Sequence, residues 1–339
     1  MTLAPPEGAV LLPIKISYSK AQAFKTCKQK FYYAHVELHP DNPKKPGLMP
    51  KVKSPALTLG SHGHAIMEHA MNAIKETPFP YTQEACQKAA QDAIVWSFTQ
   101  PDSDLTPKIM KQILHFIVNV FPTKGWQILA VEEQYMLPIG TDKVSGRPKV
   151  YPFTVDLVIM IDGQIYIVDW KFAADAYKQE RIDIEPQIPG YIGAMRALGI
   201  NVVSGFYGFL RTRDMKNVED QVVVSAVVAN DIRIKRSFME HLATTEEIIV
   251  WERGNQFTTR NTNNNCNYCD FNVLCGIELR GDDASLKKKI DFIVPGCVGD
   301  DASGVPPGFV GGRYLGSRYY RSAAVFYRTD DLAERRLRL

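Results

Sequence analysis

The chain has 339 residues, of which 45% are hydrophobic and 23% charged, as in a soluble globular protein with one large domain or two ordinary ones. Its net charge of +3 excludes a strong overall field, so any binding of nucleic acid has to rest on local patches. The longest uncharged stretch, residues 197–210, is too short to span a bilayer, and the apolar run at 9–14 lacks the basic lead of a signal peptide. We therefore expect a cytoplasmic protein that does not enter membranes. In that compartment its six cysteines favour metal binding or catalysis over disulfides.

The N-terminal part of the chain has mainly helical patterns. Ser17 or Ser19 is suited to cap the first predicted helix, and five prolines mark the loop that follows it. The expected elements in this part are a helix over 21–36, a loop over 39–55, and helices over about 59–75, 82–99 and 106–121.

Strand patterns dominate the middle of the chain. The expected strands are 128–137, 150–161, 164–172, 202–210 and 221–228, and the expected helices are 187–198, closed by Gly199, and 232–253. Helices, then a mixed sheet, then helices again predict an α/β fold in which helices flank a mixed β-sheet and extend beyond it.

The segment VYPFTVDLVIMIDGQIYIVDWKF, residues 150–172, carries the clearest chemistry. Asp162-Gly163 predicts a two-residue type I′ turn, which places Ile161 opposite Gln164. In the same register Asp156 lies opposite Asp169, and Lys171 shares their face two residues further on.

Opposed carboxylates with Cβ atoms about 5 Å apart destabilise a sheet unless something offsets their charge. Both faces of this hairpin are largely apolar, so a buried pair of acids at its end favours a bound cation, and an oxygen-rich site suits Mg²⁺ or Mn²⁺. Lys171 beside such a cation is placed to orient or activate a water molecule and to offset charge on a phosphate. The alternative from the pattern alone is a structural hairpin in which Lys171 pairs with the two acids.

This arrangement resembles the PD-(D/E)XK nucleases, whose motif is an Asp followed by Asp/Glu-x-Lys on the next strand, here Asp156 and Asp169-Trp170-Lys171. The RecB-like branch adds a Gly-x-x-x-His step, matched by Gly60 and His64, and a Gln-x-x-x-Tyr step. The second step is matched by Gln187 and Tyr191. The resemblance implies a restriction-endonuclease-like fold in which His64, Asp156 and Asp169 bind the metal, Asp156, Asp169 and Lys171 are catalytic, and Gln187 and Tyr191 support the site and DNA.

Several neighbouring residues need a separate assignment. Glu68 lies one helical turn after His64 on the same face, and we assign it a supporting role. His62 and His69 compete with His64 for the ligand position. We interpret Glu133 as an ordinary strand residue rather than a further acidic contributor.

Four cysteines form a second candidate metal site. Cys266, Cys269 and Cys275 give the spacing C-x2-C-x5-C, and Cys27 lies far upstream. By spacing alone they fit structural zinc or an iron–sulfur cluster. One distant cysteine plus a C-terminal triplet resembles the AddB and CRISPR-adaptation nucleases, which implies a [4Fe–4S] cluster on Cys27, Cys266, Cys269 and Cys275. Cys86 and Cys297 are left over.

The predicted organisation has four parts. They are an N-terminal segment over 1–55 with the first cluster cysteine, a nuclease core over 56–230, a C-terminal helix and cysteine triplet over 231–280, and a basic Gly/Pro/Arg-rich tail over 281–339. We expect the tail to be poorly ordered, the alternative being a stacking platform for single-stranded nucleic acid.

These features predict a Mg²⁺- or Mn²⁺-dependent deoxyribonuclease, with exonuclease action favoured, that cleaves single-stranded DNA or duplex ends in recombination, repair or phage DNA processing. The sequence has no G-x-x-x-x-G-K-[ST], so a helicase or recombinase partner would be a separate chain. Two alternatives are a nuclease of CRISPR spacer acquisition and a catalytically idle DNA-binding module braced by the cluster.

Overall fold

The structure is a computed structural model that describes residues 11–52, 54–254, 258–262 and 264–293. The chain forms two compact units. The first, which we call the sheet unit, comprises residues 1–26 and 53–257, and the second, the cysteine unit, comprises residues 27–52 and 258–339. The expected N-terminal segment 1–55 is thus divided between the two units. Within the described residues, no helix combines the length and apolarity that crossing a membrane requires.

The first expected helix is interrupted where the chain passes between units. It consists of α1 (Tyr18–Thr26) and α2 (Lys28–His35), with Cys27 between them in an extended conformation. Ser17 caps α1 as expected, because its hydroxyl accepts a hydrogen bond from the main-chain nitrogen of Lys20 at 3.2 Å.

The sheet unit is built on a mixed sheet, as expected, with six strands where five were expected. Its strands are β1 (Ile14–Lys15), β5 (Gln127–Thr141), β6 (Pro148–Ile161), β7 (Gln164–Ala173), β8 (Val202–Arg211) and β9 (Val222–Val227). The order is β1-β6-β7-β8-β9, and β5 also pairs with β6. β7 and β8 are parallel, as are β1 and β6, whereas the other neighbours are antiparallel.

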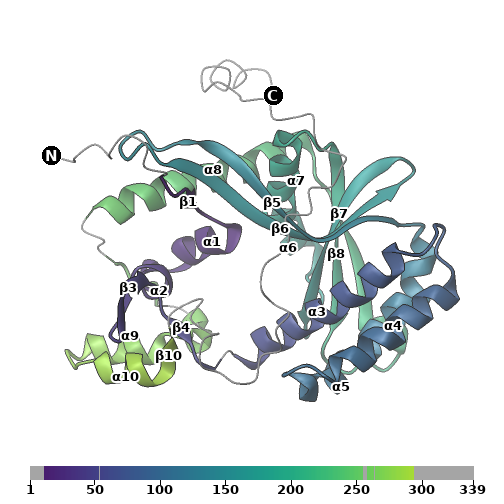
Figure 1. Cartoon of the computed structure of the whole chain (residues 1–339), viewed down its shortest axis with the longest axis horizontal. Coiled ribbons are helices and arrows are strands. Elements are labelled where there is room, and N and C mark those ends of the chain that lie inside the picture. The colour runs from purple at the N-terminus through teal and green to yellow at the C-terminus, as the bar shows by residue number, and fades with distance from the viewer. Residues whose placement is uncertain (1–10, 53, 255–257, 263, 294–339) are drawn as a thin grey trace. The chain divides into compact units, whose positions relative to one another are not determined.

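Helices cover the two faces of this sheet (Figure 1). One core lies under α3 (Pro55–Lys75), α4 (Gln83–Ser97) and α5 (Thr106–His115), and the other under α7 (Gln187–Ala197) and α8 (Asp231–Arg253), with the short α6 (Gln179–Ile184) before them. The helix expected over 106–121 is α-helical only to His115, after which a π turn (Phe116–Val120) and a 3-10 turn (Phe121–Lys124) complete it. Shorter 3-10 turns lie at Ser103–Leu105 and Val218–Gln221.

The β6–β7 hairpin confirms the predicted turn and register. Asp162 and Gly163 both have positive φ, 49° and 77°, as a type I′ turn requires. Ile161 pairs with Gln164, and the ladder runs from the turn back along β6 to Leu157, which pairs with Val168. Asp156 is the next residue in that direction. Continuing this register places Asp156 across from Asp169, as predicted, but the two residues are beyond the end of the ladder.

The cysteine unit has its own small core. It contains α2, β2 (Leu38–His39), β3 (Asn42–Pro46), β4 (Met49–Pro50), η5 (Asn264–Tyr268), α9 (Asn272–Leu279), α10 (Ser285–Asp291) and β10 (Phe292–Ile293). β4 pairs with β10, and the ring of Phe271 stacks on Phe292 at 5.4 Å in a core shared with Tyr33 and Leu274. The expectation of a loop over 39–55 and of a tail beginning at 281 is corrected here, since both stretches contribute strands to this unit. The remainder of the tail, 294–339, lies outside the described residues.

Candidate active site

Asp156 lies where the β6–β7 ladder ends. Its Oδ2 accepts a hydrogen bond from the main-chain nitrogen of Trp170 at 2.7 Å, where a further ladder bond would otherwise form. β1 pairs with β6 at Lys149 and Val150, so the stretch of β6 around Asp156 lies between two paired regions. The carboxylate is held by the backbone at this point, and its side chain is 12% exposed.

Asp169 and Lys171, on the same face of β7, form a triad with Gln187 at the start of α7. Lys171 Nζ lies 2.6 Å from Asp169 Oδ2 and donates to Gln187 Oε1 at 3.0 Å. Gln187 Nε2 donates to Asp169 Oδ1 at 2.7 Å. The Gln187 amide thus presents its oxygen to the ammonium and its nitrogen to the carboxylate. Burial alone lowers the pKa of Lys171, but the charge of Asp169 and its hydrogen bond raise the pKa above its ordinary value.

His64 comes to the site from α3. A Cβ added to Gly63 would lie 2.5 Å from the ring of Phe172 on β7, so glycine is what permits the helix to approach the strand this closely. The same addition at Gly60 meets no described atom within 4 Å. Gly63 is therefore the glycine that places His64, whose Nδ1 lies 3.5 Å from Asp156 Oδ2.

Glu132 on β5 completes this cluster, and the sequence analysis missed it. Its Oε1 lies 3.5 Å from His64 Nδ1, and one ligand atom each of His64, Glu132 and Asp156 lies within 4.8 Å of the others. Its φ of 46° is outside the usual range for a strand residue. Glu133 is exposed, which agrees with its assignment as an ordinary strand residue. The alternation of side chains along a strand does not reveal such a local reversal, so no signal in the sequence distinguished the two glutamates.

Two carboxylates and an imidazole fit a divalent cation of the Mg²⁺ or Mn²⁺ type, since these ions take oxygen ligands and Mn²⁺ also accepts imidazole. Burial, and after it the charge of Asp169, raise the pKa of Asp156 to about 8, although His64 acts to lower it. Burial lowers the pKa of His64, but the hydrogen bond with Glu132 and the charge of Asp156 outweigh it and raise the pKa to about 9. The cluster therefore retains protons at neutral pH that a cation would displace.

Tyr191 and Glu68 border the cluster in different ways. The buried Tyr191 ring stacks on Phe153 with centroids 5.2 Å apart and meets Tyr18 edge-on at 6.0 Å. Burial raises the pKa of the Tyr191 hydroxyl and the charge of Asp169 raises it further, so this group remains a neutral donor or acceptor. Burial and the charge of Glu132 raise the pKa of Glu68, which extends the acidic lining.

The competing histidines of α3 have structural partners. His62 is buried, and its Nε2 lies 2.8 Å from the hydroxyl of Thr106. The ring of His69 stacks on Trp96 with centroids 4.7 Å apart. His64 is accordingly the histidine of this helix that meets the acidic cluster.

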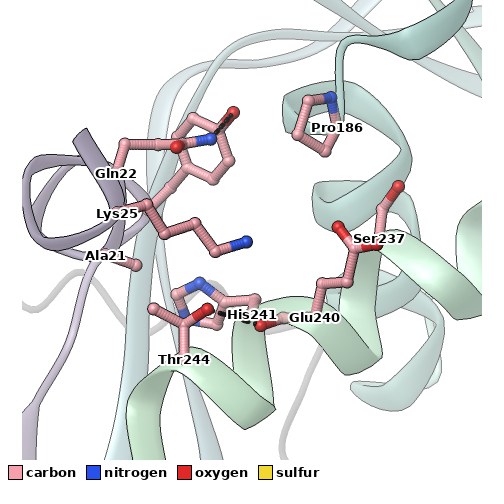
Figure 2. Close-up of a pocket in the computed structure, with 9 residues that line it drawn as sticks. Ala21, Gln22, Lys25, Pro186, Ser237, Glu240, His241 and Thr244 are labelled. Carbon is pink, nitrogen blue, oxygen red and sulfur yellow. Dashed lines mark hydrogen bonds between the residues drawn. The ribbon is translucent and has the colours of Figure 1, made fainter. Parts of the chain in front are cut away.

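A separate small cavity lies between α1 and α8 (Figure 2). Its volume of about 20 Å³ is enough for one water molecule, and it is lined by polar groups that include Lys25, Glu240 and His241. His241 stacks on Tyr151 at 3.7 Å, and Tyr151 contacts Phe153, the ring beneath Tyr191. This row of ring contacts connects the cavity wall to Tyr191.

The four cysteines of the second candidate site all belong to the cysteine unit and are half-buried. Cys27 precedes α2, Cys266 is in η5, Cys269 follows it, and Cys275 is in α9. Burial raises the pKa of Cys275, the neighbouring Arg260 lowers it, and the charge of Cys27 raises it. Four thiols are the donor type that zinc and iron–sulfur clusters use, but among the described residues no three of these sulfurs lie within 4.8 Å of one another. Cys86 is a buried thiol of the sheet unit, and Cys297 lies outside the described residues.

Comparison with known proteins gives one family. A family model described as the PD-(D/E)XK nuclease superfamily matches residues 15–276. A solved structure titled "Crystal structure of SSO0001" is 12% identical, the match covering 62% of this chain and 84% of that chain. Its TM-score of 0.31 is too low to support an argument. No curated protein matches the sequence.

Proposed function

Because the chain belongs to the PD-(D/E)XK nuclease superfamily, we propose that it is a metal-dependent deoxyribonuclease that removes nucleotides from DNA ends. The observation that carries the proposal is the meeting of His64, Asp156, Asp169 and Lys171, from three different elements, where the β6–β7 ladder ends.

The protein residues divide the work of hydrolysis. A water oxygen must bond to phosphorus while the bond to one sugar oxygen breaks; the water loses a proton to a site carboxylate or to solvent, and the leaving oxygen gains one. Lys171, kept cationic and fixed by Asp169 and Gln187, is placed to donate to the water or to a phosphate oxygen. Tyr191 and Gln187 keep this arrangement rigid from the side of α7.

His64, Asp156 and Asp169 are the residues that would hold the divalent cation in this proposal. When bound, the cation supplies positive charge to the phosphate and lowers the pKa of a bound water. Asp169 lies next to the cluster of His64, Glu132 and Asp156, and contributes its charge from the Lys171 triad.

For the cysteine unit we propose a [4Fe–4S] cluster on Cys27, Cys266, Cys269 and Cys275, with structural zinc as the alternative. Its role would be to join residues 27–52 to the chain after 258, which lie far apart in sequence. We place the protein in the cytoplasm and in DNA recombination, repair or phage DNA processing, with any helicase or recombinase as a separate chain.

The experiment that tests the function is a cleavage assay on end-labelled single- and double-stranded DNA, with free or blocked ends, in Mg²⁺, in Mn²⁺ and in EDTA. We expect cleavage with either cation, none in EDTA, and protection by blocked ends. Cleavage of blocked substrates would make the enzyme an endonuclease. DNA binding without cleavage under all conditions would leave an idle DNA-binding module.

A further inference from the structure

The geometry around His64 points to a cation ligand that the sequence motif does not contain. We propose that Glu132 is a direct ligand of the divalent cation, together with His64 and Asp156. This inference rests on the proposed metal-dependent activity and names a residue that determines how tightly the cation is held.

The first support is that three separate elements bring their side chains together at one place. Glu132, His64 and Asp156 come from β5, α3 and β6, so their meeting is not a consequence of proximity in sequence. One ligand atom of each lies within 4.8 Å of the other two, as donors around a single ion do. The Glu132 side chain is 22% exposed, so it faces a place where solvent and substrate phosphate still have access.

The second support is the backbone. Val131 pairs with Leu157 and Glu133 pairs with Val155, so Glu132 lies directly across from Asp156. A non-glycine residue at φ 46° is strained, and the surrounding pairs hold this conformation although it is unfavourable for the isolated strand. His64 Nδ1 lies 3.5 Å from an oxygen of each carboxylate, so the imidazole offsets their charge in this structure. A cation bound between the two carboxylates would supply that positive charge instead.

The third support is the state of Asp169. Its Oδ1 accepts a hydrogen bond from Gln187 at 2.7 Å, and its buried Oδ2 lies 2.6 Å from Lys171 Nζ but has no hydrogen-bond partner among the described residues. Glu132 Oε1, by contrast, faces His64, which is itself a candidate ligand. Glu132 therefore adds a carboxylate from β5 to the cation site, beside the Oδ2 that Asp169 can still offer from β7.

The test measures Mn²⁺ binding to the full chain by calorimetry and by the EPR signal of free Mn²⁺, with no DNA present. We expect Glu132→Gln to weaken Mn²⁺ at least tenfold, and Glu133→Gln, the adjacent exposed control, to leave the affinity unchanged. Glu132→Gly should weaken Mn²⁺ equally while leaving the melting temperature in EDTA no lower than that of the wild type, because glycine relieves the positive φ. Unchanged Mn²⁺ affinity in both Glu132 variants would overturn the proposal.

A ligand must also be distinguished from a residue that only orients His64. In a His64→Ala background, Glu132→Gln should weaken Mn²⁺ further if Glu132 binds the ion itself. No further loss in that background would reduce Glu132 to a positioning residue and overturn the proposal. Wild-type cleavage with Mn²⁺ is measured in parallel. A wild type that neither binds Mn²⁺ nor cleaves would refute both the nuclease function and the role of Glu132, whereas a wild type that binds Mn²⁺ and cleaves, with Mn²⁺ affinity unchanged in the Glu132 variants, would refute the role of Glu132 alone.

Discussion

The main-chain nitrogen of Trp170 donates its hydrogen bond to the carboxylate of Asp156, at 2.7 Å, instead of to a carbonyl of β6. The side chain thus takes the place of the next ladder bond. This exchange keeps the backbone group satisfied where the ladder ends, at the residues that carry the motif.

The stability of the protein should report on this buried carboxylate. Burial and Asp169 raise the pKa of Asp156 from 3.8 to about 8, so the folded state binds the proton more tightly and its stability falls as pH rises between those values. We expect Asp156→Asn to raise the free energy of unfolding in EDTA, by about 1 kcal/mol on the scale of cross-strand pairs, with a larger gain at pH 9 than at pH 5. Chemical denaturation at the two pH values measures this.

Addition of Mn²⁺ should reverse the order of the two proteins. At ten times its Kd, one bound ion stabilises the wild type by about 1.4 kcal/mol. Asp156→Asn removes a ligand and should forfeit most of that gain, so the two melting temperatures cross during the titration. A variant less stable than wild type in EDTA would contradict the repulsion, and would favour a structural pairing of the acids with Lys171.

Catalysis should depend on Lys171 far more than DNA binding does. We expect Lys171→Met and Asp169→Asn each to lower the cleavage rate by about 10²-fold or more, as loss of a preorganised charge at a reacting phosphate does. Affinity for DNA, measured by fluorescence anisotropy in Ca²⁺, should change little, because contacts to the phosphate backbone elsewhere supply most of it. The control is Lys178→Met, which removes a nearby lysine that is not part of the triad of Asp169, Lys171 and Gln187. Cleavage that survives either change would place the active site elsewhere.

Cation affinity should rise with pH. Burial lowers the pKa of His64, but Glu132 and Asp156 outweigh it and raise the pKa to about 9, so the imidazole must lose a proton before it can bind a cation. We expect the association constant for Mn²⁺ to increase from pH 6.5 to about pH 9 and then to level off. His64→Gln should bind more weakly at high pH and show a flatter dependence. Equal pH slopes in the two proteins would exclude His64 as a ligand.

The two glycines of α3 should respond in opposite ways. Gly63→Ala forces the ring of Phe172 or the helix to move, because the added Cβ would lie 2.5 Å from that ring. We expect lower stability and weaker Mn²⁺ binding through the displaced His64. Gly60→Ala adds its Cβ in open space within the same helix and should stabilise the protein by up to about 1 kcal/mol with Mn²⁺ affinity unchanged. Thermal unfolding and calorimetry of both variants provide the comparison.

The cysteine unit should carry its own metal. Protein purified without oxygen should be brown, with broad absorbance near ~400 nm, and should contain iron and sulfide. Replacement of Cys27, Cys266, Cys269 or Cys275 by Ala should remove the colour and destabilise this unit. Cys86→Ala should retain the iron, since Cys86 belongs to the sheet unit. Colourless protein with one zinc per chain would overturn the iron–sulfur assignment. The four cysteines would then keep only the structural role of joining the two segments of this unit.

Periodicity predicted the mixed sheet, the hairpin register and the positions of α3, α4, α7 and α8, because these elements follow from local patterns of burial, but it did not predict β1 or α6. Asp156, Asp169 and Lys171 were proposed from the hairpin register and the family resemblance, and His64, Gln187 and Tyr191 from the resemblance alone; their roles remain predictions. The sequence did not reveal the reversal at Glu132 or the end of the ladder at Leu157, since both depend on backbone dihedrals that side-chain alternation does not encode. It also missed the short strands β4 and β10, whose pairing joins residues distant in sequence.

The division of the cysteine unit into residues 27–52 and 258 onward has a consequence for the growing chain. On the ribosome, Cys27 is made early and then waits while the whole of the sheet unit is synthesised, roughly 10–40 s at ~5–20 residues per second. During that interval its thiol is available to cellular oxidants and free metal ions before its three proposed partners exist. A chain released before Thr258 would carry every proposed catalytic residue and a single proposed cluster ligand.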